Sequence, residues 1–314
     1  MLRFLLKTTL TLLLGSVLVI LSPGIPAAYL HEAKPGNYIE QVTVDGWLRE
    51  FRLHVPKGYN GARALPIVVV FHGSSASASV IERETSMNTR ADAFGFFVVY
   101  PEGLHRAWNI GECCRYSFLH HVSETAFLTG ILDQMHSSFM VDPSRVYVTG
   151  YSDGATLSFL LGCALPNRIA AVAGVSGTLF EPEPRCPLPK PIPAMIIHGT
   201  GDTQIPYGGD RGGPPQSKGD HFTHSAPDVA RFWVTHDGCA TPPDSARVEQ
   251  VVRLGYHCPD SAEVVFYTIL GGHHGWPGGG RGWVFSPEPP KDMIASDSIV
   301  QFFLRHQLRP SVHR

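Results

Sequence analysis

Two stretches near the start of the chain alternate apolar and polar residues, which is the pattern of half-buried β-strands. They are residues 38–44 and 47–55, and the dipeptide Asp45-Gly46 lies between them. Asp-Gly is a preferred two-residue turn between antiparallel strands, because this turn needs a positive φ at both positions. The sequence therefore predicts a β-hairpin at this end of the fold.

Further along the chain, short and nearly unbroken apolar runs replace the alternation. A strand that is covered on both faces needs apolar side chains on both, so these runs predict a parallel sheet between two layers of helices. The runs are residues 66–71, 96–100, 146–149, 169–175 and 194–197, with further strands expected at 248–254 and 264–270.

Helical spacing of apolar residues appears between and after these runs. Residues 124–136 place Phe127, Ile131 and Met135 on one face, and residues 292–308 show the same spacing. A hairpin followed by alternating strands and helices predicts an α/β fold with a doubly wound, mostly parallel sheet and an antiparallel N-terminal edge hairpin. Because no shift in composition divides the chain, we expect one domain over residues 35–309.

The N-terminal segment has the pattern of a targeting signal. Arg3 and Lys7 precede the uncharged run 8–21, and the small residues Ala27-Ala28 follow a helix-breaking stretch. The run is shorter than the roughly 20 apolar residues that span a bilayer. We expect residues 1–28 to be a signal peptide and the protein to be secreted or periplasmic; the alternative is an uncleaved N-terminal membrane anchor.

The charge balance excludes one class of partner. The chain has 25 Lys and Arg, 27 Asp and Glu, and a net charge of −2 over 314 residues. Without a basic block there is no electrostatic footprint for nucleic acid, so no nucleic-acid partner is expected. No repeat of fixed period appears, which argues against solenoids and propellers.

The cysteines indicate disulfides rather than a metal site. All six lie beyond the N-terminal segment, and an even number in an exported protein favours disulfides. Cys239 and Cys258 are the best local pair, since they flank one short excursion of the chain. The competing zinc interpretation is weak because adjacent Cys113-Cys114 lacks the spacing of a zinc knuckle. No metal or cofactor is expected.

The strongest chemical signal is the pentapeptide 150–154, Gly-Tyr-Ser-Asp-Gly. It follows the apolar run 146–149 and precedes an apolar helical stretch. A Gly-x-Ser-x-Gly motif between a strand and a helix is a nucleophile elbow, which holds a serine in a strained turn above the sheet. We therefore predict that Ser152 is a catalytic nucleophile.

A serine nucleophile needs a histidine base and an acid that orients it. In α/β-hydrolases the acid and then the histidine follow the serine along the chain. Asp202 comes directly after the run 194–197 and is the predicted acid, although Asp210 and Asp220 are nearby competitors. The base is expected in the loop after residues 264–270, where His273 and His274 stand side by side and the residues alone do not separate them.

The negative charge that develops on the substrate oxygen needs backbone N–H donors. One is expected from Asp153, which follows the nucleophile at the start of a helix. The other should come from the loop after residues 66–71, where we predict the N–H of Ser74. His72 in the same loop is expected to brace it rather than to react.

Six segments taken together resemble the secreted esterase/polyhydroxybutyrate depolymerase family, which includes feruloyl esterases and is similar to acetylxylan esterases. They are FHGS (71–74), VVYPEG (98–103), WNIGECC (108–114), VDPSRVYVTGYSDG (141–154), HGTGDTQIPYGG (198–209) and GGHHGWPG (271–278). The resemblance covers nearly all of residues 38–306. It implies the α/β-hydrolase fold and a triad of Ser152, Asp202 and His274, the histidine two residues before the Trp-Pro pair.

The resemblance also implies disulfides between Cys239 and Cys258 and between one cysteine of the 113–114 pair and Cys163 or its neighbourhood. The sequence departs from the family in two places. Ser123-Glu124 stand where an Asp-Asp pair is common, so that loop could differ in shape, and His273 stands where glycine is usual.

The substrate is the least determined feature. Trp108 and Trp276 are candidate walls of an acyl or aryl pocket, or else residues that pack the core and the histidine loop. We predict a secreted serine carboxylic-ester hydrolase for feruloyl-type or other short acyl and aryl esters. Its substrate could derive from plant cell-wall polysaccharide or from a polyester oligomer, and polyhydroxybutyrate depolymerase or acetylxylan esterase activity is the alternative.

Other functions remain open on this fold. An acyltransferase would use the same triad and pass the acyl group to an alcohol instead of water. A peptidase is a further alternative. A non-catalytic carbohydrate-binding protein would typically have lost a triad member, and all three are present here.

Overall fold

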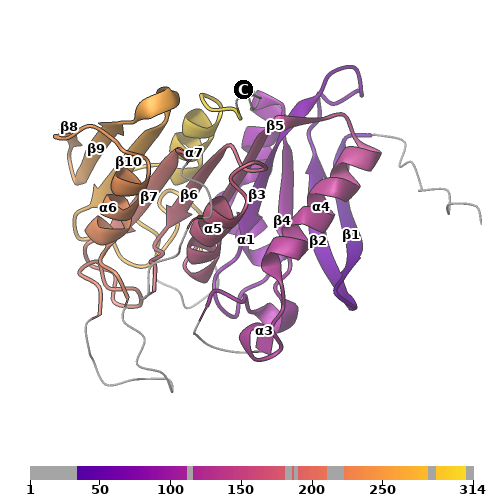
Figure 1. The fold of residues 1–314 in the computed structure, drawn as a ribbon, viewed down its shortest axis with the longest axis horizontal. Helices are drawn as coiled ribbons and strands as arrows, with labels where there is room; N and C mark the ends of the chain where they lie inside the picture. Colours follow the sequence, from indigo (N-terminus) through magenta and orange to yellow (C-terminus); the bar gives the residue numbers. More distant parts are fainter. Residues whose placement is uncertain are drawn as a thin grey trace, which may run out of the picture.

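The computed structural model describes residues 34–111, 116–180, 186, 190–210, 223–281 and 288–308. In this part of the chain one ten-stranded sheet is covered by helices on both faces (Figure 1). The strands are β1 (Gly36–Val44), β2 (Trp47–Val55), β3 (Leu65–Phe71), β4 (Phe97–Pro101), β5 (Val141–Tyr151), β6 (Ala171–Val175), β7 (Ala194–Gly199), β8 (Asp244–Val248), β9 (Val251–His257) and β10 (Glu263–Ile269). The helices are α1 (Ala78–Thr85), α2 (Met87–Phe94), α3 (Tyr116–Leu119), α4 (Glu124–Ser138), α5 (Asp153–Ala164), α6 (Ala226–His236) and α7 (Ala295–Phe303), with short 3₁₀ helices at Leu104–Arg106 and Pro259–Ser261.

The strand order is β1-β2-β4-β3-β5-β6-β7-β10-β9-β8. Neighbouring strands from β4 to β10 run parallel, and the predicted hairpin β1–β2 joins this core antiparallel to β4. In the hairpin Val44 pairs with Trp47, and Asp45 and Gly46 both have the positive φ that the turn requires. The α/β fold with a mostly parallel sheet and an N-terminal antiparallel edge is confirmed.

The opposite edge of the sheet differs from the prediction. A single strand was expected over residues 248–254, but Val248 ends β8 and Val251 begins β9. Glu249 between them has a φ of 50°, so the chain reverses and β8 pairs antiparallel with β9. The turn consists only of Glu249 and Gln250 between valines and has no Gly, Pro or Asn to mark a reversal, which is why the sequence pattern did not reveal it.

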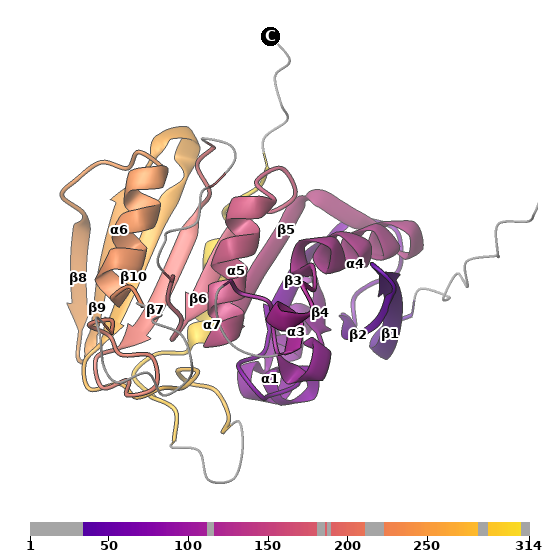
Figure 2. The ribbon, with the colours of Figure 1, turned by 60° about the horizontal axis from the view of Figure 1, so that its bottom comes forward.

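The two faces of the sheet bury two separate sets of side chains. Successive residues of β3 alternate between them, with Ile67 and Val69 on one face and Val68 and Val70 on the other. Helices α4, α5 and α6 cover the first face, and α1, α2 and α7 cover the second. Figure 2 shows α4, α5 and α6 in front of the sheet and α7 behind it. This is the doubly wound arrangement that the apolar runs predicted.

The two predicted helices are present with different lengths. Helix α4 begins where expected, because the Ser123 side chain accepts a hydrogen bond from the Ala126 N–H and caps it. Helix α7 is shorter than the predicted 292–308. Beyond it the Leu308 N–H donates to the Ser144 carbonyl, and the Tyr147 hydroxyl donates to the His306 carbonyl, so the chain leaves the helix to lie along the sheet.

Parallel strands have their carboxyl ends at the same end of the sheet, and the loops that carry the predicted catalytic residues lie there. Strands β3, β5, β7 and β10 end at Phe71, Tyr151, Gly199 and Ile269. The loops after β7 and β10 are joined directly, since the Gly201 N–H donates to the Gly272 carbonyl at 2.9 Å. Among the described residues, no helix combines the length and the apolar character needed to cross a bilayer.

Candidate active site

Ser152 lies in the tight turn between β5 and α5. Its φ of 57° and ψ of −122° fall outside the regions that most residues occupy. The turn depends on its glycines: a Cβ on Gly150 would lie 2.3 Å from the Gly154 carbonyl oxygen, and a Cβ on Gly154 would lie 2.3 Å from that of Phe71. The strained turn therefore forms only with these small residues, and it has the predicted form of a nucleophile elbow.

His274 connects the serine to an acid. Its Nε2 lies 3.1 Å from the Ser152 Oγ, and its Nδ1 lies 2.7 Å from the Asp202 Oδ2. With the Nδ1–H donating to the carboxylate, Nε2 is free to accept the serine hydroxyl proton. His273 is exposed, and its Nδ1 lies 3.4 Å from the Gly201 carbonyl oxygen. The structure thus places His274, rather than its neighbour, between the serine and the acid.

Asp202 is buried and held in one orientation. The backbone N–H groups of Gln204 and Ile205 both donate to its Oδ1 at 2.9 Å. Burial alone would raise the pKa of Asp202, but hydrogen bonds from His198, His274 and the Ile205 N–H outweigh it and hold the pKa well below its usual value. Asp202 is therefore an anion at any pH near neutrality.

Of the two competing acids, Asp210 lies elsewhere. Asp210 forms an isolated β-bridge with Thr223, and Asp220 lies outside the described residues.

His198 is a part of this site that the sequence analysis did not single out. It is buried, its Nε2–H donates to the Ile205 carbonyl at 2.8 Å, and the same nitrogen lies 3.4 Å from the Asp202 Oδ2. His198 thus stabilises the loop that carries Asp202. A histidine at the end of the buried run before Asp202 was the available signal.

Hydrogen bonds of the His72 ring hold the loop after β3 in place. Its Nδ1–H donates to the Gly73 carbonyl at 2.7 Å, and its Nε2 accepts a hydrogen bond from the Gly103 N–H at 2.9 Å. Burial lowers the pKa of His72 to about 4, so the ring is neutral and both contacts persist at neutral pH. Ser74, which follows this braced segment, faces the same cavity as Ser152, and Asp153 begins α5.

A cavity of about 160 Å³ opens beside the serine. Its walls come from the loop after β3, from α1, from the elbow and from the loop after β10. The residues that line it are Gly73, Ser74, Ala76, Val80, Glu84, Tyr151, Ser152, Gln204, His274, Gly275, Trp276, Gly280, Arg281 and Pro289. Glu84 in this wall was also missed; its place three residues after buried Ile81 on α1 was the available signal.

The two candidate tryptophans occupy different places. Trp276 lines the cavity, and its indole N–H donates to the Ser296 hydroxyl. Trp108 is only 2% exposed; its indole N–H donates to the His72 carbonyl, and its ring packs against Phe71. Trp108 therefore lies in the core beneath the loop after β3, away from the described wall of the cavity.

One predicted disulfide is confirmed and one is wrong. Cys239 is bonded to Cys258. Cys163 was expected to bond to Cys113 or Cys114, but it is bonded to Cys186, because the end of α5 lies close to the segment after β6, with 4.6 Å between the two Cα atoms. Cys113 and Cys114 lie outside the described residues.

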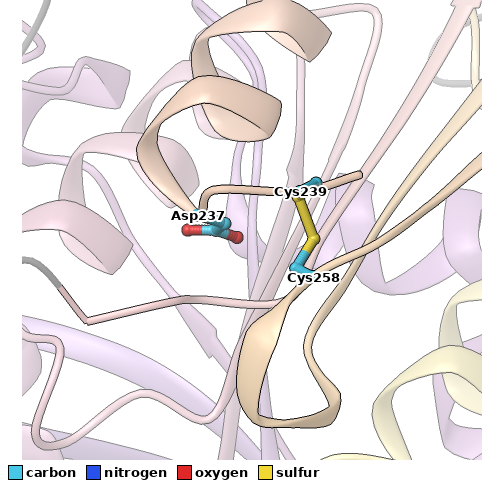
Figure 3. Close-up of side chains that lie close together, drawn as sticks. All are labelled: Asp237, Cys239 and Cys258. Carbon is cyan, nitrogen blue, oxygen red and sulfur yellow. A yellow bond between two sulfur atoms is a disulfide. The ribbon is translucent and has the colours of Figure 1, made fainter. Parts of the chain in front are cut away.

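Asp237 lies beside the Cys239–Cys258 disulfide, and ligand atoms of the three residues come within 4.8 Å of one another (Figure 3). The two sulfur atoms are bonded to each other, so neither is a thiolate that could bind a metal ion. The Asp237 carboxylate instead accepts hydrogen bonds from the Ile192 N–H and from the His236 ring. The cluster is thus a disulfide beside a carboxylate that holds neighbouring segments together through hydrogen bonds.

Comparison with known proteins agrees with this geometry. The profile of the family described as Esterase PHB depolymerase matches residues 49–186. NocK of Nocardia uniformis subsp. tsuyamanensis, which is named as an esterase, is 30% identical over 287 residues, covering 84% of this chain and 81% of NocK. Feruloyl esterase B of Piromyces equi is 28% identical over 244 residues; the match covers 76% of this chain but only 44% of that longer protein.

Among solved structures, an acetyl xylan esterase from Aspergillus awamori superposes with a TM-score of 0.57 at 16% identity, over 85% of this chain and 98% of that one. This similarity supports the α/β-hydrolase fold. The family profile and the relatives lead to one conclusion: the chain belongs to the esterase/PHB depolymerase family of carboxylic ester hydrolases.

Proposed function

We propose that this protein is an exported serine esterase that hydrolyses carboxylic esters through a covalent acyl-enzyme. The observation that carries the proposal is the continuous chain of hydrogen bonds from the Ser152 hydroxyl through His274 to the Asp202 carboxylate. Such a chain supplies what a serine lacks by itself, which is a base within reach and an anion that fixes the tautomer of that base.

In the acylation step, the Ser152 Oγ attacks the ester carbonyl carbon while its proton passes to the His274 Nε2. Asp202 stabilises the imidazolium that results. The N–H groups of Ser74 and Asp153 are the proposed donors to the oxyanion. Collapse of the tetrahedral intermediate breaks the bond to the alcohol, which leaves with the proton from His274. Water then attacks the acyl-enzyme by the same route and releases the acid.

For the substrate, we propose a short acyl or aryl ester of the feruloyl type. Support comes from the likeness to Feruloyl esterase B and from the small cavity that Trp276 lines. A polyester oligomer is the second candidate, favoured by the family profile, whose description names PHB depolymerase. Two disulfides among the described residues favour an oxidising compartment, in line with the proposed removal of residues 1–28 on export. We also propose that residues 35–309 form one catalytic domain.

The purified mature chain should be tested on p-nitrophenyl acetate, methyl ferulate, acetylxylan and hydroxybutyrate oligomers, with Ser152→Ala as the control. We expect hydrolysis of at least one substrate, loss of that activity in the serine variant, and unchanged rates in the presence of a chelator, because the triad chemistry uses no metal ion. A Ser152→Ala protein that folds and keeps its activity would refute the proposed mechanism.

A further inference from the structure

The carboxyl group of Glu84 is buried in the wall of the active-site cavity. The residue is only 8% exposed and lines the cavity together with Ser152 and His274. It lies in the last turn of α1, on the same buried face as Ile81. The triad uses Asp202 as its acid, so the mechanism above gives this second carboxyl group no task.

Among the described residues, no hydrogen-bond donor reaches the Glu84 carboxyl, and the charge of Arg83 is its main polar influence. Glu82, two positions earlier, differs, since it accepts hydrogen bonds from Arg52 and Asn88. Buried polar groups are almost always hydrogen-bonded, because leaving one unpaired is costly. A buried carboxyl group that has no hydrogen-bond donor among the described residues, in the wall of the cavity beside Ser152, is therefore in place to bind the substrate.

The backbone around this carboxyl group is fixed by the loop that carries His274. The Gly280 N–H donates to the Glu84 carbonyl at 2.9 Å, and the Ser296 hydroxyl donates to the Thr85 carbonyl at 2.7 Å. The Ser296 oxygen in turn accepts the Trp276 indole N–H. These hydrogen bonds fix the position of Glu84 relative to the loop of the catalytic histidine, as a substrate-binding group requires.

The titratable and charged groups around Glu84 leave its carboxyl group available for a substrate hydroxyl near neutral pH. They are Arg83 on α1, Tyr151 at the elbow, and His274 and Arg281 on the loop after β10. Burial raises the pKa of Glu84 to about 7, which the Arg83 charge only partly offsets. Arg281 is engaged by Glu288, and burial keeps the Tyr151 hydroxyl neutral by raising its pKa.

We propose that Glu84 is a hydroxyl-binding subsite, through which the enzyme selects esters that carry a hydroxyl group close to the ester carbonyl over otherwise identical esters that lack it. The inference rests on the proposed esterase function. A substrate hydroxyl can donate to the Glu84 carboxylate, or exchange hydrogen bonds with the protonated acid, and so satisfy the group that the described residues leave unpaired. An ester without that hydroxyl would leave the carboxyl unpaired and lose binding in the transition state.

The test compares p-nitrophenyl 3-hydroxybutyrate with p-nitrophenyl butyrate, which differ by one hydroxyl group. The measured quantity is the ratio of the two kcat/KM values, in which the common contribution of the triad cancels. Glu84→Met, which is close in size and apolar, should lower this ratio at least tenfold. Glu84→Gln retains a hydrogen-bonding group and should preserve part of the preference. Glu50→Gln changes an exposed carboxylate on β2 and should leave the ratio unaltered.

The pH dependence gives a second measurement that needs no apolar variant. In the wild type, the ratio should rise several-fold between pH 6 and pH 8, because an ionised carboxylate accepts a stronger hydrogen bond than the protonated acid. In Glu84→Gln the ratio should be flat over that range. A wild-type ratio that does not change with pH, or a Glu84→Met variant that slows both esters equally, would overturn the inference. If the wild type hydrolyses neither ester nor any of the panel above, the esterase proposal itself has failed.

Discussion

At the scale of single residues, the choice between His273 and His274 is a matter of burial and reach. The two side chains are neighbours in sequence, yet one is exposed and the other lies 3.1 Å from the serine oxygen. Their substitution by alanine should therefore have very different effects.

His274→Ala should reduce kcat by about 10⁶-fold, similar to Ser152→Ala within about tenfold, because members of one triad act as a unit. His273→Ala should cost no more than about tenfold, the scale of a small shift in loop packing. Hydrolysis of p-nitrophenyl acetate at mildly alkaline pH measures both, with circular dichroism to check folding. An inactive His273→Ala beside an active His274→Ala would reverse the assignment.

Asp202→Asn tests the orientation of the same ring. An amide at this position would favour the wrong tautomer of His274, and kcat should fall by roughly 10⁴-fold, less than for loss of the nucleophile. The same assay at constant pH measures it. A variant that retains more than a tenth of the activity would show that Asp210 or another acid serves His274.

Glu84 also gives a pH dependence to stability. Its pKa is raised by burial from 4.5 to about 7 in the folded protein, so between these values the folded chain holds a proton that the unfolded chain has lost. The free energy of unfolding should therefore fall as pH rises from about 4.5, by up to roughly 3 kcal/mol, and level off above 7. Glu84→Gln should lack this decline. Urea denaturation at pH 5 and pH 8 measures the free energy of unfolding. An equal loss of stability between these two pH values in variant and wild type would contradict the prediction.

At the scale of elements, the loop after β3 depends on the neutral ring of His72. One ring nitrogen holds the carbonyl of Gly73, the residue before the proposed oxyanion donor Ser74, and the other holds the Gly103 N–H. The brace was expected from the sequence, whereas the partner in the segment after β4 was not, because no local pattern connects residues so far apart.

His72→Ala should lower kcat by about 10- to 100-fold with little change in KM, because a misplaced donor affects the transition state more than substrate binding. His72→Asn retains a donor at the Nδ1 position and should recover part of the loss. Steady-state kinetics of both variants on one ester measures this. A rise in KM with normal kcat would show that the loop binds substrate instead.

The Cys239–Cys258 disulfide fastens the C-terminal edge of the sheet. It joins the end of α6 to the end of β9 across 19 residues of sequence. Closing a loop of this length is worth about 3 kcal/mol in the chain-entropy model. Replacing both cysteines by serine should lower stability by about that amount while activity persists, as measured by chemical denaturation and ester hydrolysis. Unaltered stability would show that the strand pairing alone holds this edge.

At the scale of the whole molecule, the proposed export of the protein requires removal of the first 28 or so residues. We expect the chain recovered from medium or periplasm to begin near residue 29, because the uncharged run is too short to hold in a bilayer and small residues follow it. N-terminal sequencing or intact mass of that protein measures the cleavage. A chain that starts at Met1 and sediments with membranes would favour the anchor.

Features that depend on local patterns could be predicted from the amino-acid sequence. Alternation, apolar runs and the Asp-Gly turn predicted the hairpin and the parallel core, and a strained turn that only glycines permit predicted the place of Ser152. Each is set by neighbours within a few residues, so periodicity and steric fit were enough to find it.

Features that depend on contacts between distant segments became visible in the folded protein. The tertiary structure placed His274 beside the serine, as the resemblance had implied and the residues alone had left open. It joined Cys163 to Cys186, placed Trp108 in the core and turned one expected strand into the β8–β9 pair. It also brought Glu84, a residue with the sequence appearance of an ordinary helix-surface acid, into the wall beside the serine. Burial and partnership at these positions arise from packing between elements, and sequence periodicity carries no information about which elements meet.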